Sequence, residues 1–309
     1  KAARIALAAG GGHAAGGGRI VDVSPRRDHG VDAAMMAARC AAIAGAAGTS
    51  NVAAAMRFGL RPVGTMAHSY VLSFATEEEA FRAFLEDNPD NAVLLVDTYD
   101  SVEGVRAAIR ASHATGVALQ GIRLDSGDLL ALSRRARRLL DEAGMRHARI
   151  LASGDLEEHQ IARLVAAGAP IDTFGVGTDL GTSRDAPAVG GVYKIVADRG
   201  RDGRWRPVAK TSPGKATLPW PKQVFRSVRD GRMTADTIAR ADEPLEGEPL
   251  LVAVMEAGTV VHRESVEQIR DRAARSLESL PEHLRRTERS GPDHPVSLSR
   301  RIAAEPVSR

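Results

Sequence analysis

The order of apolar runs along this 309-residue chain constrains its fold more than any other feature. Six short runs, each able to form a buried strand, alternate with stretches in which apolar residues recur every three or four positions, as in amphipathic helices. Strands that alternate with helices form parallel sheets covered on both faces. The sequence therefore predicts an α/β fold, and we favour a (β/α) barrel over a doubly wound sheet because six units precede a change in pattern. The six runs cover residues 19–24, 61–65, 92–98, 119–128, 148–155 and 172–179.

The pattern changes after about residue 190. The segments that follow alternate apolar and polar residues and carry turn dipeptides, such as Asp202-Gly203 and Asp230-Gly231, which predict antiparallel strands. From residue 265 an amphipathic helix is expected, followed by a polar tail. We therefore predict a barrel core with the active site at 1–190, a smaller β-rich subdomain at 191–262, and a C-terminal helix and polar tail at 263–309.

Composition narrows the functional class. The chain is 43% hydrophobic and 26% charged, as in folded soluble proteins, and its net charge is +3. Lys and Arg form no block interleaved with aromatic residues, so we predict no nucleic-acid partner. Cys40 is the only cysteine, which excludes a disulfide within the chain and favours a reducing cytoplasm.

The chain also lacks the sequence signals of membrane proteins. No apolar run is long enough to span a membrane, and the first residues lack the apolar core and cleavage site of a secretory signal. We therefore expect a cytoplasmic protein without a membrane partner. The chain opens at Lys1, within a helical pattern, and we expect a further segment upstream of it.

Polar residues gather at the C-terminal end of each predicted strand, the edge where barrels and open parallel sheets hold their active sites. Asp and Ser at such positions also cap helices, and either interpretation fits a single cluster such as DSGD. Six clusters together favour a site. Its candidate members are Arg26, Arg27, Thr65, His68, Asp97, Arg123, Asp125, Asp128, Ser153, Asp155, Gly177, Thr178 and Asp179.

The candidate ligand is anionic. In GVGTDLGTS, residues 175–183, glycines would let backbone amides approach an anion closely, although such a stretch is often only a turn. The nearby carboxylates suit a magnesium-bound polyphosphate, because Mg²⁺ takes one or two carboxylates and leaves its other positions to phosphate and water. Arginine can clamp either a carboxylate or a phosphate. An anionic substrate with a phosphorylated partner is therefore predicted.

His68 is the candidate reactive group. A single histidine is more often structural, but this one follows Thr65 and precedes Ser69 at a predicted strand end. It has no Cys or second His beside it, so zinc binding is disfavoured. An imidazole in this position could accept a phosphoryl group.

Five long motifs resemble the nicotinate phosphoribosyltransferase family, over most of residues 18–226. The resemblance implies a barrel of the quinolinate and nicotinate phosphoribosyltransferase type. It also implies synthesis of nicotinate mononucleotide from nicotinate and phosphoribosyl pyrophosphate, coupled to ATP hydrolysis through a phosphohistidine, in a homodimer. The motifs are GTSNVAAAMRFGLRPVGTMAHSYV, RLDSGDL, ASGDLEE, FGVGTDLGTSRDAPAVGGVYKIV and KTSPGKATLP.

The resemblance also implies roles for individual residues. His68 matches the phosphorylated histidine, and Thr65 and Arg123, with Arg26 and Arg27 nearby, match nicotinate contacts. The phosphoribosyl phosphate is expected at Gly177, Thr178, Asp125 and Ser153, and Mg²⁺ at Asp155.

The chain departs from the family pattern in three places, and two other functions stay open. It lacks the family's TDLYQ-like motif, it has Pro25 in PRRDHG, and it reads LPWPKQ after Lys215. A related phosphoribosyltransferase for nicotinamide or quinolinate, or an inactive barrel fragment, remain alternatives.

Overall fold

The computed structural model describes residues 1–10, 19–288 and 291–304, which divide into two compact units. The first comprises Lys1–Pro187 together with Val266–Ala274 and Arg286–Glu288. The second comprises Ala188–Ser265 and Arg275–Arg285, with the described residues after 290. Within the described residues, no helix is long and apolar enough to cross a membrane.

Five parallel strands form the centre of the first unit, in the order β1-β5-β4-β3-β2. Single-residue parallel bridges extend this sheet from Asp22 to Thr49 and from Thr49 to Pro62. Around the sheet the segments therefore follow one another in cyclic chain order, as in a (β/α) barrel. The strands are β1 (Ile20–Asp22), β2 (Val93–Leu95), β3 (Gly121–Leu124), β4 (Arg149–Ala152) and β5 (Thr173–Val176).

The side of the barrel between Pro62 and β2 has no strand ladder among the described residues. The predicted strand over 61–65 was wrong, because only Pro62 forms a bridge and a proline has no N–H to donate to a ladder. Asn91 Nδ2 donates to the carbonyl oxygen of Gly64 at 3.0 Å and joins the two edges there. The barrel is thus incomplete on this side.

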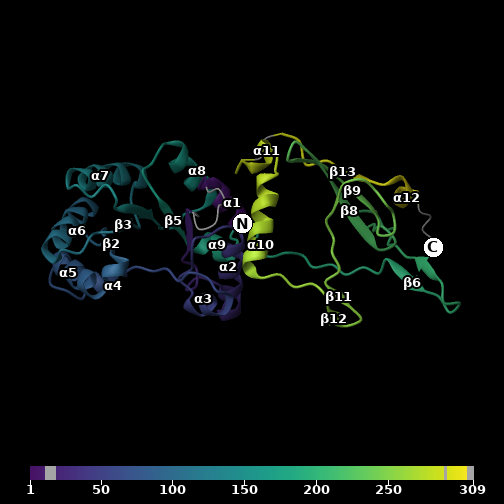
Figure 1. Ribbon diagram of the computed structural model, residues 1–309, viewed down its shortest axis with the longest axis horizontal. Helices are drawn as coiled ribbons and strands as arrows, with labels where there is room; N and C mark the ends of the chain where they lie inside the picture. Colours follow the sequence, from purple (N-terminus) through teal and green to yellow (C-terminus); the bar gives the residue numbers. More distant parts are fainter. Residues whose placement is uncertain (11–18, 289–290, 305–309) are drawn as a thin grey trace. The chain divides into compact units, whose positions relative to one another are not determined.

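Side chains alternate along the strands between the helices and the interior. Ile20, Ile122 and Phe174 are at most 1% exposed and belong to the main hydrophobic core, whereas their neighbours Val21 and Gly175 line an internal cavity. Figure 1 shows α5, α6, α7 and α8 outside the strands. This two-residue period separates the packed core from the site.

Helix boundaries follow from local caps. Asp100 accepts hydrogen bonds from the amides of Val102 and Glu103 and so begins α6, which ends at Gly116 with φ 71°. The helices of this unit are α1 (Ala2–Ala8), α2 (Val31–Ile43), α3 (Val52–Phe58), α4 (His68–Val71), α5 (Glu77–Asp87), α6 (Ser101–Thr115), α7 (Leu129–Glu142), α8 (Glu158–Ala166) and α9 (Thr178–Thr182). A 3₁₀ turn, η1 (Pro89–Asn91), precedes β2, and α10 (Val266–Glu278) contributes its first part.

The second unit is built on a four-stranded sheet, ordered β10-β8-β9-β13. The turn at Asp230 and Gly231 has φ values of 51° and 71°, as a two-residue hairpin requires. Two short hairpins and two short helices complete the described part. The sheet strands are β8 (Lys222–Arg229), β9 (Arg232–Arg240), β10 (Glu248–Pro249) and β13 (Val296–Leu298). The other elements are β6 (Ala197–Arg199), β7 (Trp205–Pro207), β11 (Met255–Glu256), β12 (Thr259–Val260), α11 (Glu282–Arg285) and α12 (Arg300–Ala303).

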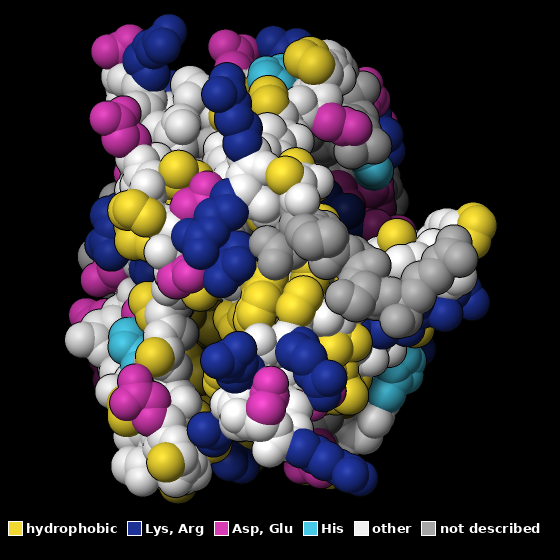
Figure 2. Space-filling model, turned by 90° about the vertical axis from the view of Figure 1, so that its right-hand side faces the viewer, with side chains coloured by type: hydrophobic (Ala, Val, Ile, Leu, Met, Phe, Trp, Pro, Cys, Tyr) yellow, Lys and Arg dark blue, Asp and Glu magenta, His cyan; other side chains and the backbone are white. Residues whose placement is uncertain are grey.

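Two expectations for this half of the chain need correction. The end of the chain is not only a polar tail, because β13 pairs in parallel with β9 and Ile302 of α12 is 2% exposed. The apolar run at 249–254 forms little strand, and Leu251, Val252 and Val254 are exposed. Figure 2 shows hydrophobic side chains at the surface among Lys and Arg side chains.

Candidate functional site

A cavity of about 1320 Å³ occupies the interior of the barrel. Its wall includes Val21, Leu95 and Leu151, which are inward-facing strand residues. The polar residues predicted for the site lie toward the C-terminal ends of the strands, as expected for a barrel, except Thr65 and His68, which no strand precedes directly in the described part of the chain. Those that line the cavity are Arg26, Thr65, His68, Arg123, Asp125 and Ser153.

Arg123 is the hub of this polar group. Its Nε donates to Ser153 Oγ at 2.8 Å, one terminal nitrogen donates to Asp125 Oδ1 at 2.5 Å, and the other contacts Thr65 Oγ1 at 3.3 Å. Ser153 Oγ donates to the same oxygen of Asp125 at 2.5 Å. Burial raises the pKa of Asp125, but the Ser153 hydrogen bond and the charge of Arg123 outweigh it and leave that pKa below its ordinary value.

His68 begins the short helix α4 and faces the same carboxylates. Its Nδ1 lies 3.1 Å from Thr98 Oγ1, whereas Nε2 lies 3.8 Å from Asp125 Oδ2 and 3.9 Å from Asp97 Oδ1. The side chain is 41% exposed. The hydroxyl can fix the ring through Nδ1, and Nε2 then remains available beside two acidic groups.

Asp97 is a buried acceptor that fixes the loop after β3. Its side chain is 1% exposed, and Oδ2 accepts hydrogen bonds from the amide of Asp125 at 2.7 Å and from Ser126 Oγ at 2.9 Å. Glu77, at the start of α5, is a neighbour that sequence patterns did not identify. Burial, together with the charges of Asp97 and Asp100, raises the pKa of Glu77 to about 7.

The remaining predicted residues lie at strand ends but not in the cavity wall. Asp155 is exposed at φ 45° after Gly154, whose backbone approaches the carbonyl of Asp125 so closely that a Cβ would lie 1.9 Å from its oxygen. Gly177 is the N-cap of α9, and Thr178 is its first residue. The wall likewise excludes Arg27.

Two acidic candidates have structural roles instead. Asp128 caps α7 by accepting hydrogen bonds from the amides of Leu130 and Ala131, which is the capping alternative that the sequence left open. Asp179 is 7% exposed and pairs with Lys1, outside the cavity wall. Lys1 also pairs with Glu158, the last residue of the ASGDLEE motif, and the sequence analysis predicted neither contact of Lys1.

A preformed metal cage is not found in the described part of the chain, where no three His, Cys, Asp or Glu side chains gather as metal ligands. An all-protein site for zinc or calcium would need more ligands than this. Magnesium that arrives with a polyphosphate needs only one or two carboxylates. Asp125 in the cavity wall and exposed Asp155 are available for that smaller demand.

Comparison with known proteins identifies the family. Residues 19–196 match the "Nicotinate phosphoribosyltransferase (NAPRTase) family", and residues 244–304 match the "Nicotinate phosphoribosyltransferase C-terminal domain". The chain belongs to the nicotinate phosphoribosyltransferase family. A nicotinate phosphoribosyltransferase of Mycobacterium tuberculosis is 44% identical over 309 residues, covering 99% of this chain and 64% of that protein. One from Bacillus subtilis is 44% identical over 238 residues, covering 75% of this chain and 48% of that protein.

Two solved structures share the fold. The human nicotinic acid phosphoribosyltransferase structure superposes with a TM-score of 0.75 at 24% identity, covering 98% of this chain and 72% of that one. The structure of a nicotinate-nucleotide pyrophosphorylase from Pyrococcus furiosus superposes with a TM-score of 0.70 at 24% identity, covering 90% of this chain and 68% of that one. These likenesses confirm the predicted fold class. The chain nonetheless spans only 64% of the Mycobacterium tuberculosis relative that it matches almost throughout.

Proposed function

We propose that this chain carries the active-site barrel of a nicotinate phosphoribosyltransferase. In the reaction, the pyridine nitrogen of nicotinate attacks C1 of phosphoribosyl pyrophosphate, and pyrophosphate leaves to give nicotinate mononucleotide. ATP and water are converted to ADP and phosphate in the coupled half of the cycle. The observation that carries the proposal is that Arg123 and His68 line one cavity and both contact Asp125.

Arg123 would hold the carboxylate of nicotinate, with Thr65 as a second contact. Its guanidinium already lies in the cavity wall, paired with one carboxylate and two hydroxyls, and a guanidinium can bind a further carboxylate through two parallel hydrogen bonds. Arg26 adds a second cation to the same wall. Arg27, next in the chain, would act at the entrance.

The phosphoribosyl group would bind at the ends of β3, β4 and β5. Ser153 and Asp125 face the cavity there, and Gly177 and Thr178 begin the short helix after β5. The exposed carboxylate of Asp155 follows β4 and would hold Mg²⁺, which would neutralise the pyrophosphate. The small number of carboxylates fits a metal that is shared with the substrate.

His68 would couple ATP to the transfer. With Nδ1 directed to Thr98, Nε2 is the nitrogen that would attack the terminal phosphorus of ATP, release ADP and carry a phosphoryl group. Water would later hydrolyse the phosphohistidine to phosphate. The carboxylates of Asp97 and Asp125 near Nε2 would stabilise a charged imidazole.

We also propose that the protein acts in the cytoplasm as a homodimer. A single cysteine suits a reducing compartment, and the homodimer is what the resemblance to the family implies. Sedimentation of the protein at micromolar concentration tests the dimer.

A substrate assay tests the proposed function. Nicotinate mononucleotide formation is measured with nicotinate, phosphoribosyl pyrophosphate, Mg²⁺ and ATP, in parallel with nicotinamide and with quinolinate. Of the three pyridines, only nicotinate is expected to give a mononucleotide product. Turnover of nicotinamide or quinolinate in its place would assign the cavity to a different pyridine. The absence of turnover and of substrate binding with all three would favour an inactive barrel.

A further inference from the structure

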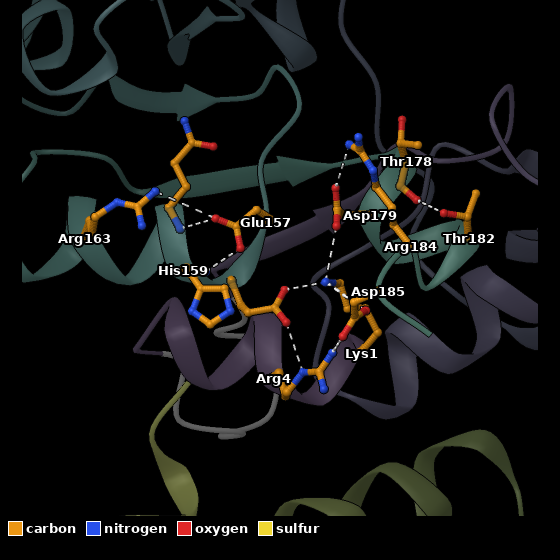
Figure 3. Close-up of polar contacts among 12 residues, drawn as sticks. Lys1, Arg4, Glu157, His159, Arg163, Thr178, Asp179, Thr182, Arg184 and Asp185 are labelled. Atoms are coloured by element: carbon orange, nitrogen blue, oxygen red, sulfur yellow. Dashed lines mark hydrogen bonds and ion pairs between the residues drawn. The ribbon is translucent and has the colours of Figure 1, made fainter. Parts of the chain in front are cut away.

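The buried ammonium of Lys1 contacts the loops that follow β4 and β5. The side chain of Lys1 is 6% exposed, and its Nζ lies 2.7 Å from Glu158, 3.2 Å from Asp179 and 3.2 Å from Asp185 (Figure 3). The side chains of Glu158 and Asp179 are 3% and 9% exposed. Three carboxylates, one from the segment after β4 and two from the segment after β5, thus converge on one cation.

Two arginines balance the remaining charge. Arg4 Nε lies 3.0 Å from Glu158, and a terminal nitrogen of Arg4 pairs with Asp185. Arg184 lies 3.7 Å from the second oxygen of Asp179. Three cations therefore face three carboxylates, and Lys1 is the most deeply buried of the cations.

Glu158 and Asp185 of this cluster are ionised at neutral pH. Burial raises the pKa of Glu158, but the hydrogen bond and charge of Lys1 outweigh it and leave that pKa below its usual value. The same balance brings the pKa of Asp185 down to about 2. Removing the ammonium would therefore leave the anionic carboxylate of Glu158 in a buried position with one ion-pair partner fewer.

The chain positions of these carboxylates connect the cluster to the cavity. Glu158 is the first residue of α8, shortly after Ser153 and Asp155, and Asp179 directly follows Thr178. Lys1 therefore contacts the segment after β4 and the segment after β5 at once. If it were lost, Glu158 would keep Arg4 and Asp179 would keep Arg184. These two carboxylates would lose the cation that they share, and each could gain water by a movement of its own loop.

We propose that Lys1 is a positioning residue, whose ammonium holds the loops after β4 and β5 in the arrangement that binds the phosphoribosyl phosphate. The identity of the ligand rests on the proposed function, whereas the shared anchoring of the two loops rests on the contacts alone. If the ion pairs of Lys1 served only to stabilise the fold, their loss would lower the stability of the whole unit without affecting these two loops in particular.

Hydrogen exchange in the Lys1→Met variant tests the anchoring. We expect faster exchange, by about tenfold, in both loops, residues 153–157 and 177–183, while the interior of α6 keeps its wild-type rates. Arg226→Met is the matched control. It also removes a partly buried cation from an ion pair, the one that Arg226 forms with Asp236 in the second unit. It should leave both loops unchanged. Wild-type rates in the two loops of Lys1→Met, or an equal rise throughout the unit, would overturn the proposal.

Binding of phosphoribosyl pyrophosphate with Mg²⁺, measured by calorimetry, tests the consequence. Lys1→Met should bind it about tenfold more weakly and bind nicotinate as the wild type does. An unchanged affinity for phosphoribosyl pyrophosphate would overturn the positioning role. If the wild type does not bind it, the proposed function fails, and hydrogen exchange still decides whether Lys1 anchors the loops.

A second variant guards against loss of folding. Lys1→Arg keeps the positive charge, but its planar guanidinium cannot meet three carboxylates as a compact ammonium does. We expect the same two loops to exchange faster, by a smaller factor. If Lys1→Met does not fold and Lys1→Arg exchanges as the wild type does, the proposal is wrong.

Discussion

Arg123 shows how one residue on a strand organises the cavity of this nicotinate phosphoribosyltransferase relative. Its neighbours Ile122 and Leu124 are fully buried on the outer side of β3, so the two-residue period of the strand directs Arg123 inward. Hydroxyls and a carboxylate then hold the guanidinium. A fixed cation in a cavity is suited to distinguish a charged ligand from a neutral one.

The first prediction concerns that distinction. Charged hydrogen bonds contribute roughly 1.5–3 kcal/mol, so Arg123→Ala should weaken nicotinate binding by about one to two orders of magnitude. Nicotinamide has no carboxylate and should lose much less. Arg149→Ala is the control. Arg149 lines the same cavity but is the first residue of β4, at the end of the strand away from Ser153. Calorimetry with both ligands checks this, and equal losses for the two would refute the assignment.

Glu77 provides a second test at this scale. Because its pKa is raised to about 7, folded Glu77 keeps a proton that the unfolded chain releases near pH 4.5. The free energy of unfolding therefore falls as pH rises from about 4.5 to 7, because the folded protein must ionise a buried carboxyl. Above that range this loss of stability stays constant. Glu77→Gln should leave stability unchanged near pH 4 and raise it by roughly 1–3 kcal/mol at pH 8.

Urea unfolding of the Glu77→Gln variant across this pH range checks the prediction. Glu79→Gln, an exposed change on the same helix, serves as the control and should not alter the pH dependence. A Glu77→Gln variant with the same stability difference at pH 4 and pH 8 would contradict a proton held by Glu77.

At the scale of elements, close backbone packing fixes α6 against the end of β2. A Cβ on Gly104 would lie 2.0 Å from the carbonyl oxygen of Val96, so this position admits only glycine without a shift of the helix. Asp97 and Thr98, which contact Asp125 and His68, directly follow Val96. The packing of α6 thus bears directly on the site.

Gly104→Ala should destabilise the protein although alanine favours helices. Overpacking of this kind costs about 1–3 kcal/mol, against a gain of up to about 1 kcal/mol from helix propensity. Gly190→Ala, where a Cβ would meet nothing within 4 Å, should be neutral. Chemical denaturation of both variants measures the difference. If Gly104→Ala were as stable as the wild type, α6 would not be held at this contact.

The sequence predicted elements better than their contacts. Strand and helix periods identified five parallel strands, and the strand-end rule identified Arg123 and Ser153 as neighbours, because both follow from local patterns and chain order. His68 lines the same cavity although the strand predicted before it is absent from the described residues. Pro62 did not extend its strand, since it lacks the donor that a ladder needs. The contacts of Lys1 with Glu158 join residues far apart in sequence, and no local pattern encodes such a pair.

At the scale of the whole molecule, the chain divides into two compact units and matches two family models. The barrel strands lie within residues 19–196, whereas residues 244–304 supply only the two short outer strands of the four-stranded sheet, β10 and β13. The proposed chemistry depends on the first unit, where the cavity and its charged residues lie. Its central claim is that the cavity accepts a phosphoryl group from ATP on His68.

Labelling of the protein by ATP tests this claim most directly. After incubation with ATP that carries label on its terminal phosphate, with Mg²⁺ present, we expect acid-labile, base-stable label on the wild type and on His159→Ala. His159 is an exposed histidine of α8 and serves as the matched control. His68→Ala should carry no label and should lose the stimulation of nucleotide synthesis by ATP. Label retained by His68→Ala, or an unlabelled wild type that still makes nicotinate mononucleotide faster with ATP, would contradict the account.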